Sequence, residues 1–69
     1  MKHIANVMRT NDWNINQEST IGKIIEKGRG KTRRYRIEWL GGAAQEFKNY
    51  YDACVFSING GASNFVRPV

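Results

Sequence analysis

The segment of residues 32–40 alternates between apolar and charged side chains, and this pattern constrains the fold more than any other feature of the chain. A period of two residues is typical of a β-strand with one buried and one exposed face. The two faces would hold Tyr35, Ile37 and Trp39 on one side and Arg34, Arg36 and Glu38 on the other. Residues 21–27 resemble a second strand, and the glycines of Gly28-Arg29-Gly30 permit a tight turn. The sequence therefore predicts a β-hairpin with its apolar face in the core.

The composition of the whole chain favours an all-β fold. Its 69 residues, 41% of them hydrophobic, fit one small globular domain over residues 1–69 without a linker. Leucine occurs once, whereas isoleucine occurs seven times and valine four times, and β-branched side chains favour strands over helices. Glycine pairs and asparagines supply the residues that turns require. We therefore expect a sheet of several short strands.

Three further segments flank the predicted hairpin. Residues 1–10 contain Ile4, Val7 and Met8 and predict an opening strand. Residues 11–20 are polar and rich in asparagine, apart from Trp13 and Ile15, which predicts a long loop. Residues 64–69 predict a short final strand, because Pro68 is suited to a sheet edge or a strand end.

Residues 43–59 permit two interpretations. Their apolar side chains recur at spacings of three and four, which suits an amphipathic helix. The same stretch can instead be divided into a strand at residues 45–48, a turn at 49–52 and a second strand at 53–58. We favour the divided interpretation, because the apolar run of the second strand ends at the turn formed by Asn59-Gly60-Gly61.

The order of these parts resembles a known plan of small β-domains. The resemblance is carried by Ile21-Gly22-Lys23-Ile24-Ile25-Glu26, by Tyr35-Arg36-Ile37-Glu38-Trp39-Leu40-Gly41-Gly42, and by Phe47 through Tyr51-Asp52-Ala53. This pattern resembles the SH3-like barrels of Tudor, chromo-barrel and KOW-type modules, and it is similar to short SH3-like proteins encoded by bacteriophages. The resemblance implies a small SH3-like barrel of about five short strands, with one helical turn before the last strand. Members of that group bind nucleic acid, methylated side chains or short peptides.

Positive charge is concentrated in a single segment, although the net charge of the chain is only +5. Residues 23–36 hold seven basic side chains against one acidic side chain, Glu26, whereas the other 55 residues hold four basic and five acidic ones. The basic residues are Lys23, Lys27, Arg29, Lys31, Arg33, Arg34 and Arg36. Clustered lysine and arginine favour nucleic-acid phosphates, because binding releases condensed counterions. The first hypothesis is therefore a binding module that contacts DNA or RNA phosphates with weak sequence specificity.

Two aromatic residues extend this hypothesis, and one other partner competes with nucleic acid. Trp13 and Tyr50 are the candidates for stacking on bases if the target is single-stranded. The alternative is a protein–protein interaction module, such as a phage-encoded modulator that docks on an acidic host protein through the same basic hairpin. A solvated hairpin with no ligand accounts for the charges equally simply. All three interpretations use the same residues, so the sequence leaves them open.

The sequence offers no constellation of catalytic residues. His3 is the single histidine and Cys54 the single cysteine, so neither a structural zinc site nor an internal disulfide can be built. Cys54 lies in an apolar run, where a buried, unreactive thiol is expected. Residues 28–32 have the composition of a phosphate loop, but they lack its glycine spacing and its following helix. We therefore expect a protein that is not an enzyme and needs no metal or cofactor.

Location and self-association can also be addressed from the sequence. No apolar run approaches 18 residues, and the N-terminus lacks the apolar core of a signal peptide, which predicts a cytoplasmic protein with no membrane partner. Small open-edged sheets often pair between copies, so a homo-oligomer is expected. Its surfaces would come from the apolar residues near the two termini, which are Ile4, Val7, Met8, Phe65 and Val66.

Overall fold

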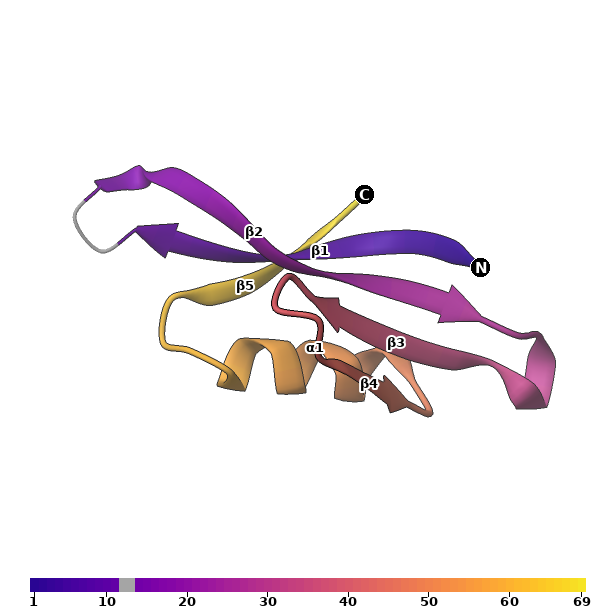
Figure 1. Ribbon diagram of the computed structural model, residues 1–69. Helices are drawn as coiled ribbons and strands as arrows, with labels where there is room; N and C mark the ends of the chain where they lie inside the picture. The colour runs from indigo at the N-terminus through magenta and orange to yellow at the C-terminus, as the bar shows by residue number, and fades with distance from the viewer. Residues whose placement is uncertain (12–13) are drawn as a thin grey trace.

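Five antiparallel strands form one sheet in the computed structural model, in the order β4-β3-β2-β1-β5 (Figure 1). The structure describes residues 1–11 and 14–69, and the side chains of residues 1–10 and 17–69. The elements in chain order are β1 (Lys2–Asn11), β2 (Asn14–Lys27), the 3-10 turn η1 (Gly30–Thr32), β3 (Arg34–Trp39), β4 (Ala44–Phe47), α1 (Tyr50–Asn59) and β5 (Asn64–Pro68). The predicted all-β domain, with five strands and a helical segment before the last, is confirmed.

The predicted hairpin forms with the predicted faces. Strands β2 and β3 pair with Ile24 opposite Ile37 and with Gly22 opposite Trp39. Ile37 is fully buried, and Tyr35 and Trp39 pack against the same core cluster. Placing one of these side chains in the core places all three there, because residues two apart in a strand share a face.

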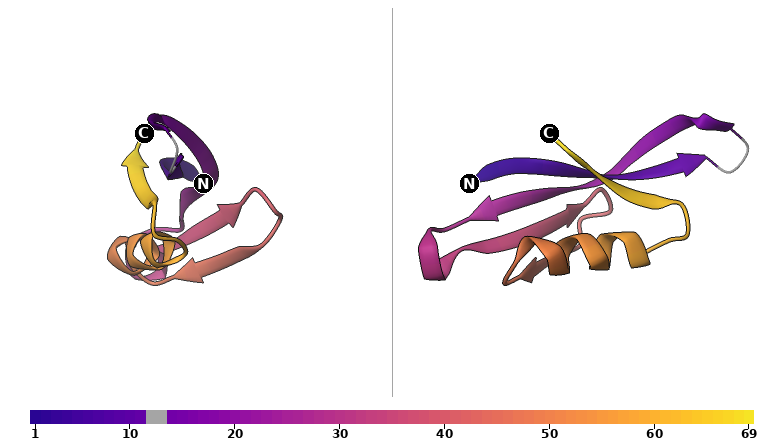
Figure 2. Two further views of the ribbon diagram at one scale, coloured as in Figure 1. Left: turned by 90° about the vertical axis from the view of Figure 1, so that its left-hand side faces the viewer. Right: turned by 180° about the vertical axis from the view of Figure 1, so that it is seen from behind.

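The core lies between the sheet and α1. Its fully buried members come from β1, β2, β3 and the helix, and they are Ala5, Val7, Ile24, Ile37 and Ala53. Helix α1 contacts β3, β4 and β5, and therefore touches strands at both edges of the sheet. Figure 2 shows the helix lying along one side of the twisted sheet. The helix thus covers the apolar face that the curled sheet leaves open.

The predicted loop over residues 11–20 is wrong, because β2 begins at Asn14. Residues of β1 and β2 stay paired far beyond the core, with Arg9 opposite Ser19 and Thr10 opposite Glu18. Backbone pairing of this kind needs no apolar side chain, since the hydrogen bonds of the ladder are made by the main chain. Glu18 also forms an ion pair with Arg67 of β5, with Oε2 and Nη1 2.6 Å apart.

The predicted strand over residues 53–58 is also wrong, and the predicted single helical turn is a ten-residue helix. Asn49 caps the helix, because its side-chain oxygen accepts a hydrogen bond of 2.8 Å from the backbone N–H of Asp52. At the other end, the amide of Asn64 donates to the carbonyl oxygen of Ser57 at 3.1 Å. The turn expected at residues 49–52 therefore begins the helix, which the buried side chains of Ala53 and Ser57 then anchor against the sheet.

The apolar residues near the N-terminus do not offer a docking surface. Val7 is fully buried, Met8 is 7% exposed, and Ile4 packs against the core. Val66 also packs against the core. The ring centroid of Phe65 lies 5.5 Å from Cζ of the Arg67 guanidinium. The expectation that Val7 and Met8 join two copies is therefore wrong, because they already lie in the core of one copy. Within the described part of the chain, no helix has the length and apolarity to cross a membrane.

Candidate functional site

The hairpin between β2 and β3 ends in a compact tip, which comprises residues 28–34. Gly28 has a φ of 76° and Gly30 a φ of 54°, in the left-handed region that favours glycine. The hydroxyl of Thr32 donates to the carbonyl oxygen of Arg29 at 2.8 Å and accepts from the Arg29 backbone N–H at 3.3 Å. The Arg33 backbone N–H donates to the carbonyl oxygen of Gly30 at 3.2 Å. The tip backbone is thus fixed by its own hydrogen bonds.

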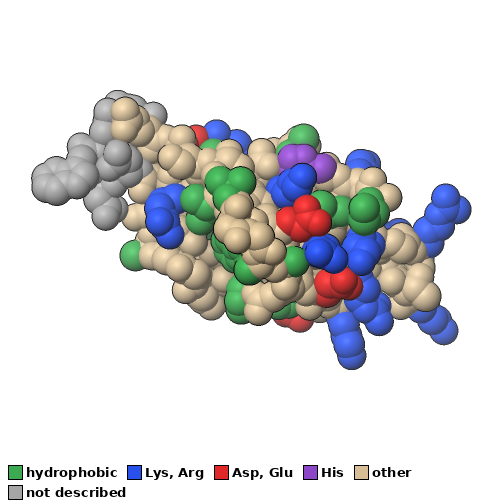
Figure 3. All heavy atoms as spheres, in the orientation of Figure 1, with side chains coloured by type: hydrophobic (Ala, Val, Ile, Leu, Met, Phe, Trp, Pro, Cys, Tyr) green, Lys and Arg blue, Asp and Glu red, His purple; other side chains and the backbone are tan. Residues whose placement is uncertain are grey.

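Four cationic side chains project from this tip: Arg29, Lys31, Arg33 and Arg34. The first three are exposed, and Arg34 is half-buried because its Nη1 donates to the carbonyl oxygens of Lys31 and Arg33. Among the side chains of residues 1–10 and 17–69, no carboxylate forms an ion pair with any of the four. Figure 3 shows lysine and arginine gathered at this end of the molecule. Four like charges held close together favour the binding of an anion.

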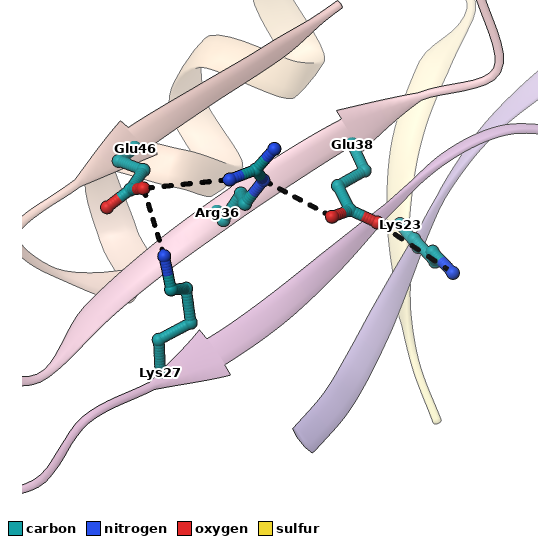
Figure 4. Close-up of polar contacts among 5 residues, drawn as sticks. All are labelled: Lys23, Lys27, Arg36, Glu38 and Glu46. Carbon is teal, nitrogen blue, oxygen red and sulfur yellow. Dashed lines mark hydrogen bonds and ion pairs between the residues drawn. The ribbon is translucent and has the colours of Figure 1, made fainter. Parts of the chain in front are cut away.

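The other three cations of the basic segment are neutralised in part by carboxylates of β3 and β4 (Figure 4). Lys27 Nζ lies 3.1 Å and Arg36 Nη1 3.8 Å from Glu46 Oε2. On the other side, Lys23 Nζ lies 3.8 Å from Glu38 Oε1. The buried Nε of Arg36 lies 3.2 Å from Glu38 Oε2, an ion pair without the alignment of a hydrogen bond. Lys23, Lys27 and Arg36 therefore belong to an ion-pair network across β2, β3 and β4.

Strand register explains why the basic segment divides in this way. Lys23 stands opposite Glu38 and Arg36 stands opposite Glu46, so opposite charges meet directly across the sheet. Glu38 could have been recognised in the sequence, because it shares the outer face of β3 with Arg36. Glu46 could not, since its position depends on how β4 pairs with β3. Of the seven candidate ligand-binding cations in the sequence, four therefore have no carboxylate partner among the side chains that the structure describes.

Two lysines from outside the basic segment also lie toward the tip. Lys2 stands opposite Glu26, one residue before the end of β2. Lys48 directly follows Phe47, which stands opposite Tyr35 near the start of β3. Both lysines are exposed. The basic end of the molecule is therefore wider than the segment that the sequence singled out.

Of the two residues predicted to stack on bases, Trp13 and Tyr50, the structure describes only Tyr50. Trp13 lies outside the described residues. Tyr50 is half-buried rather than projecting, and its ring centroid lies 5.8 Å from that of Tyr35. Burial and a hydrogen bond with Cys54 raise the pKa of the Tyr50 phenol to about 12. Tyr50 thus serves as a packing residue at the start of α1, and the strongly exposed tyrosine is its neighbour Tyr51.

The raised pKa of Tyr50 predicts a loss of stability in alkaline solution. The phenol has a pKa of 10.0 when unperturbed and about 12 in the folded protein, so the folded state holds its proton more tightly. The stabilisation is complete below about pH 10 and is lost as the pH rises through about 12. We expect Tyr50→Phe to reduce this alkaline loss of stability in denaturant titrations, whereas the control Tyr51→Phe retains it. An equal loss in wild type and Tyr50→Phe would show that Tyr50 is not responsible.

The remaining reactive side chains are dispersed. His3 Nε2 lies 2.7 Å from Asn6 Oδ1 and 3.0 Å from the carbonyl oxygen of Ala5. Cys54 is half-buried on α1 rather than fully buried. Within the described residues, no three histidine, cysteine, aspartate or glutamate side chains gather as a metal site. A strand follows the glycine-rich tip, which agrees with the exclusion of a phosphate loop.

Comparisons with protein-family models, curated proteins and solved structures found no match to this chain.

Proposed function

We propose that this protein is a small binding module that contacts nucleic-acid phosphates through the basic tip of its β2–β3 hairpin. The observation that supports this proposal is the separation of charges within the hairpin. Lys23, Lys27 and Arg36 are paired with carboxylates, whereas Arg29, Lys31, Arg33 and Arg34 are not paired within the described part of the chain. Cations without a carboxylate partner gain most from a phosphate, because no ion pair must first be broken.

The composition of the tip favours phosphates over a protein surface. Residues 26–34 contain no apolar or aromatic side chain. Protein interfaces take most of their binding energy from aromatic and other large side chains that are buried at the centre. A phosphate backbone needs only positive charge and hydrogen-bond donors, and arginine supplies both. The resemblance to SH3-like modules, some of which bind nucleic acid, agrees with this proposal.

The same tip argues for weak sequence specificity. Reading bases directly requires a helix or a β-ribbon whose side chains reach base edges in a groove. The β2–β3 ribbon ends in a three-residue 3-10 turn, so a turn with exposed cations, and not paired strand residues, stands at its tip. Contacts of this kind fix the protein on the backbone without reading the sequence. We expect a dissociation constant of about 10⁻⁴ to 10⁻⁶ M at physiological salt, similar for unrelated sequences.

Salt dependence of binding tests this proposal. Fluorescence anisotropy with a labelled duplex of arbitrary sequence should give a plot of log affinity against log salt with a slope of about −3.6 if four phosphates are contacted. The double variant Lys31→Gln/Arg33→Gln removes two contacts, so we expect its slope to be less steep by about 1.8. The fold should be unaffected, since both side chains are exposed.

The matched control removes the same charge from outside the tip. Lys23→Gln/Arg67→Gln breaks two surface ion pairs, which are worth about 0–1 kcal/mol each, and should leave the slope nearly unchanged. Equal losses in the two double variants would mean that net charge alone governs binding. If wild-type protein binds neither DNA nor RNA at about 20 mM salt, where screening is weak, the proposal fails and an acidic protein becomes the partner to test.

A further inference from the structure

The outer face of α1 carries large apolar side chains that the described part of the chain leaves partly exposed. Ala53 and Ser57 face the sheet and are fully buried. Tyr51, Val55 and Ile58 are spaced at i, i+4 and i+7, and at about 100° per residue they lie on the side opposite Ala53 and Ser57. Their exposed fractions are 75%, 38% and 47%. We call these three residues the helix stripe.

The helix stripe departs from the usual pattern of a surface helix. Such helices turn their large apolar side chains toward the core and their polar side chains toward water. Here two small side chains, Ala53 and Ser57, are the fully buried ones, Tyr50 and Phe56 pack at the flanks, and the three residues of the helix stripe are exposed. An aromatic side chain can bury about 150–250 Å² of surface, so Tyr51 alone leaves more than about 100 Å² uncovered. Large apolar side chains exposed along one side of a helix are candidates for an interaction site.

The distribution of charge indicates what can cover the stripe. Residues 49–66 contain one charged side chain, Asp52, in a chain whose net charge is +5. An acidic partner would be attracted to the basic tip and would gain nothing from this neutral face. An anionic membrane surface would require several lysines or arginines beside the stripe, whereas residues 48–66 contain only Lys48. A second copy of this chain, repelled by charge elsewhere, meets the least repulsion here.

We propose that two copies of the protein associate by packing α1 against α1 in antiparallel orientation, with the helix stripes in contact. A stripe that faces its own copy about a two-fold axis is self-complementary, because each residue meets an equivalent surface. The helix lies along the long axis of a molecule of 43 × 20 × 19 Å, with the basic tip at one end (Figures 1 and 3). Antiparallel packing therefore directs the two basic tips away from each other, and salt screens charges beyond about 10 Å.

The size of the stripe predicts a weak dimer. A ten-residue helix is about 15 Å long and about 10 Å wide, so contact between the two helices alone buries much less than the roughly 1,200–2,000 Å² of a standard interface. We therefore expect a monomer–dimer equilibrium and not a permanent dimer. Sedimentation of the wild-type protein from about 10 µM to about 500 µM brackets the affinities expected of such interfaces. The average mass should rise from 7.9 kDa toward twice that value.

Two variants test whether the helix stripe makes the contact. Tyr51→Glu and Val55→Glu each place a charge in the proposed interface, and each should hold the average mass at 7.9 kDa over the whole range. Tyr51 stands in the first turn of α1, where a carboxylate favours the helix, so this variant should remain folded. The control Ser19→Glu makes the same change of charge at an exposed position on β2 and should associate like wild type.

Other results would overturn the proposal. Wild-type protein that stays at 7.9 kDa at about 500 µM would show that no second copy covers the helix stripe. Folded Tyr51→Glu and Val55→Glu proteins that associate like wild type would place the contact on another surface, such as the exposed edge strand β4. The tip variant Lys31→Gln/Arg33→Gln should still dimerise, so failure of the dimer and failure of phosphate binding can be distinguished.

Discussion

Replacing Ile37 with alanine is expected to lower the free energy of unfolding by about 2–5 kcal/mol. Ile37 is fully buried, stands opposite the equally buried Ile24, and belongs to the cluster that joins β1, β2, β3 and α1. The substitution removes apolar contacts and leaves a cavity that a tightly packed sheet can fill only in part. A small domain has about 5 kcal/mol of stability in all, so the variant should be largely unfolded or close to it.

Denaturant titration measures this effect, and the control is a substitution at the residue that pairs with Ile37 in the sheet. Gln45 of β4 stands opposite Ile37 in the sheet, but its side chain is exposed. Gln45→Ala should therefore change the free energy of unfolding by less than about 0.5 kcal/mol. If the two variants unfold at the same denaturant concentration, Ile37 does not lie in the core.

Replacing Gly28 with alanine is expected to lower the free energy of unfolding by about 1–3 kcal/mol and to weaken binding by the tip. The residue has a φ of 76°, which side chains with a Cβ atom rarely adopt. An added Cβ would also lie 2.6 Å from the carbonyl oxygen of Thr32, which belongs to the backbone and cannot rotate away. The tip must therefore open, which displaces the cations held on it.

Gly41 provides the control, because a Cβ there meets no atom within 4 Å and its φ is not positive. Gly41→Ala should change the free energy of unfolding by less than about 0.5 kcal/mol and leave binding to DNA unchanged. Thermal unfolding and anisotropy on the two variants would measure both effects. A Gly28→Ala protein as stable as Gly41→Ala would mean that the tip adopts a different backbone conformation.

The candidate site could be found from the sequence only in outline. Seven basic residues in fourteen identified the hairpin, because clustered charge is visible in sequence order. The ion pairs of Glu38 and Glu46 reduced the seven to four, and they depend on which strands lie side by side. Lys2 and Lys48 approach the same end for that reason alone. Charge density is local in sequence, whereas charge pairing is a property of the assembled sheet.

The same distinction between local sequence and assembled structure applies to the fold. The sequence by itself determined the β2–β3 hairpin and its buried face, because alternation of side chains and turn glycines act over a few neighbouring residues. It also determined the all-β class, because the chain is rich in β-branched residues and has a single leucine. These features depend on local backbone preference and on the period of two.

Only the tertiary structure determined the secondary structure of two segments that the local sequence pattern assigns wrongly. Residues 14–20 are polar except for Ile15, and they extend a strand because β1 offers an unpaired backbone beside them. Residues 53–58 have strand propensity, yet they form a helix because the small side chains of Ala53 and Ser57 fit closely over the sheet. Local propensities differ by about 1 kcal/mol or less per residue, so pairing with a neighbouring strand or burial against a sheet overrides them.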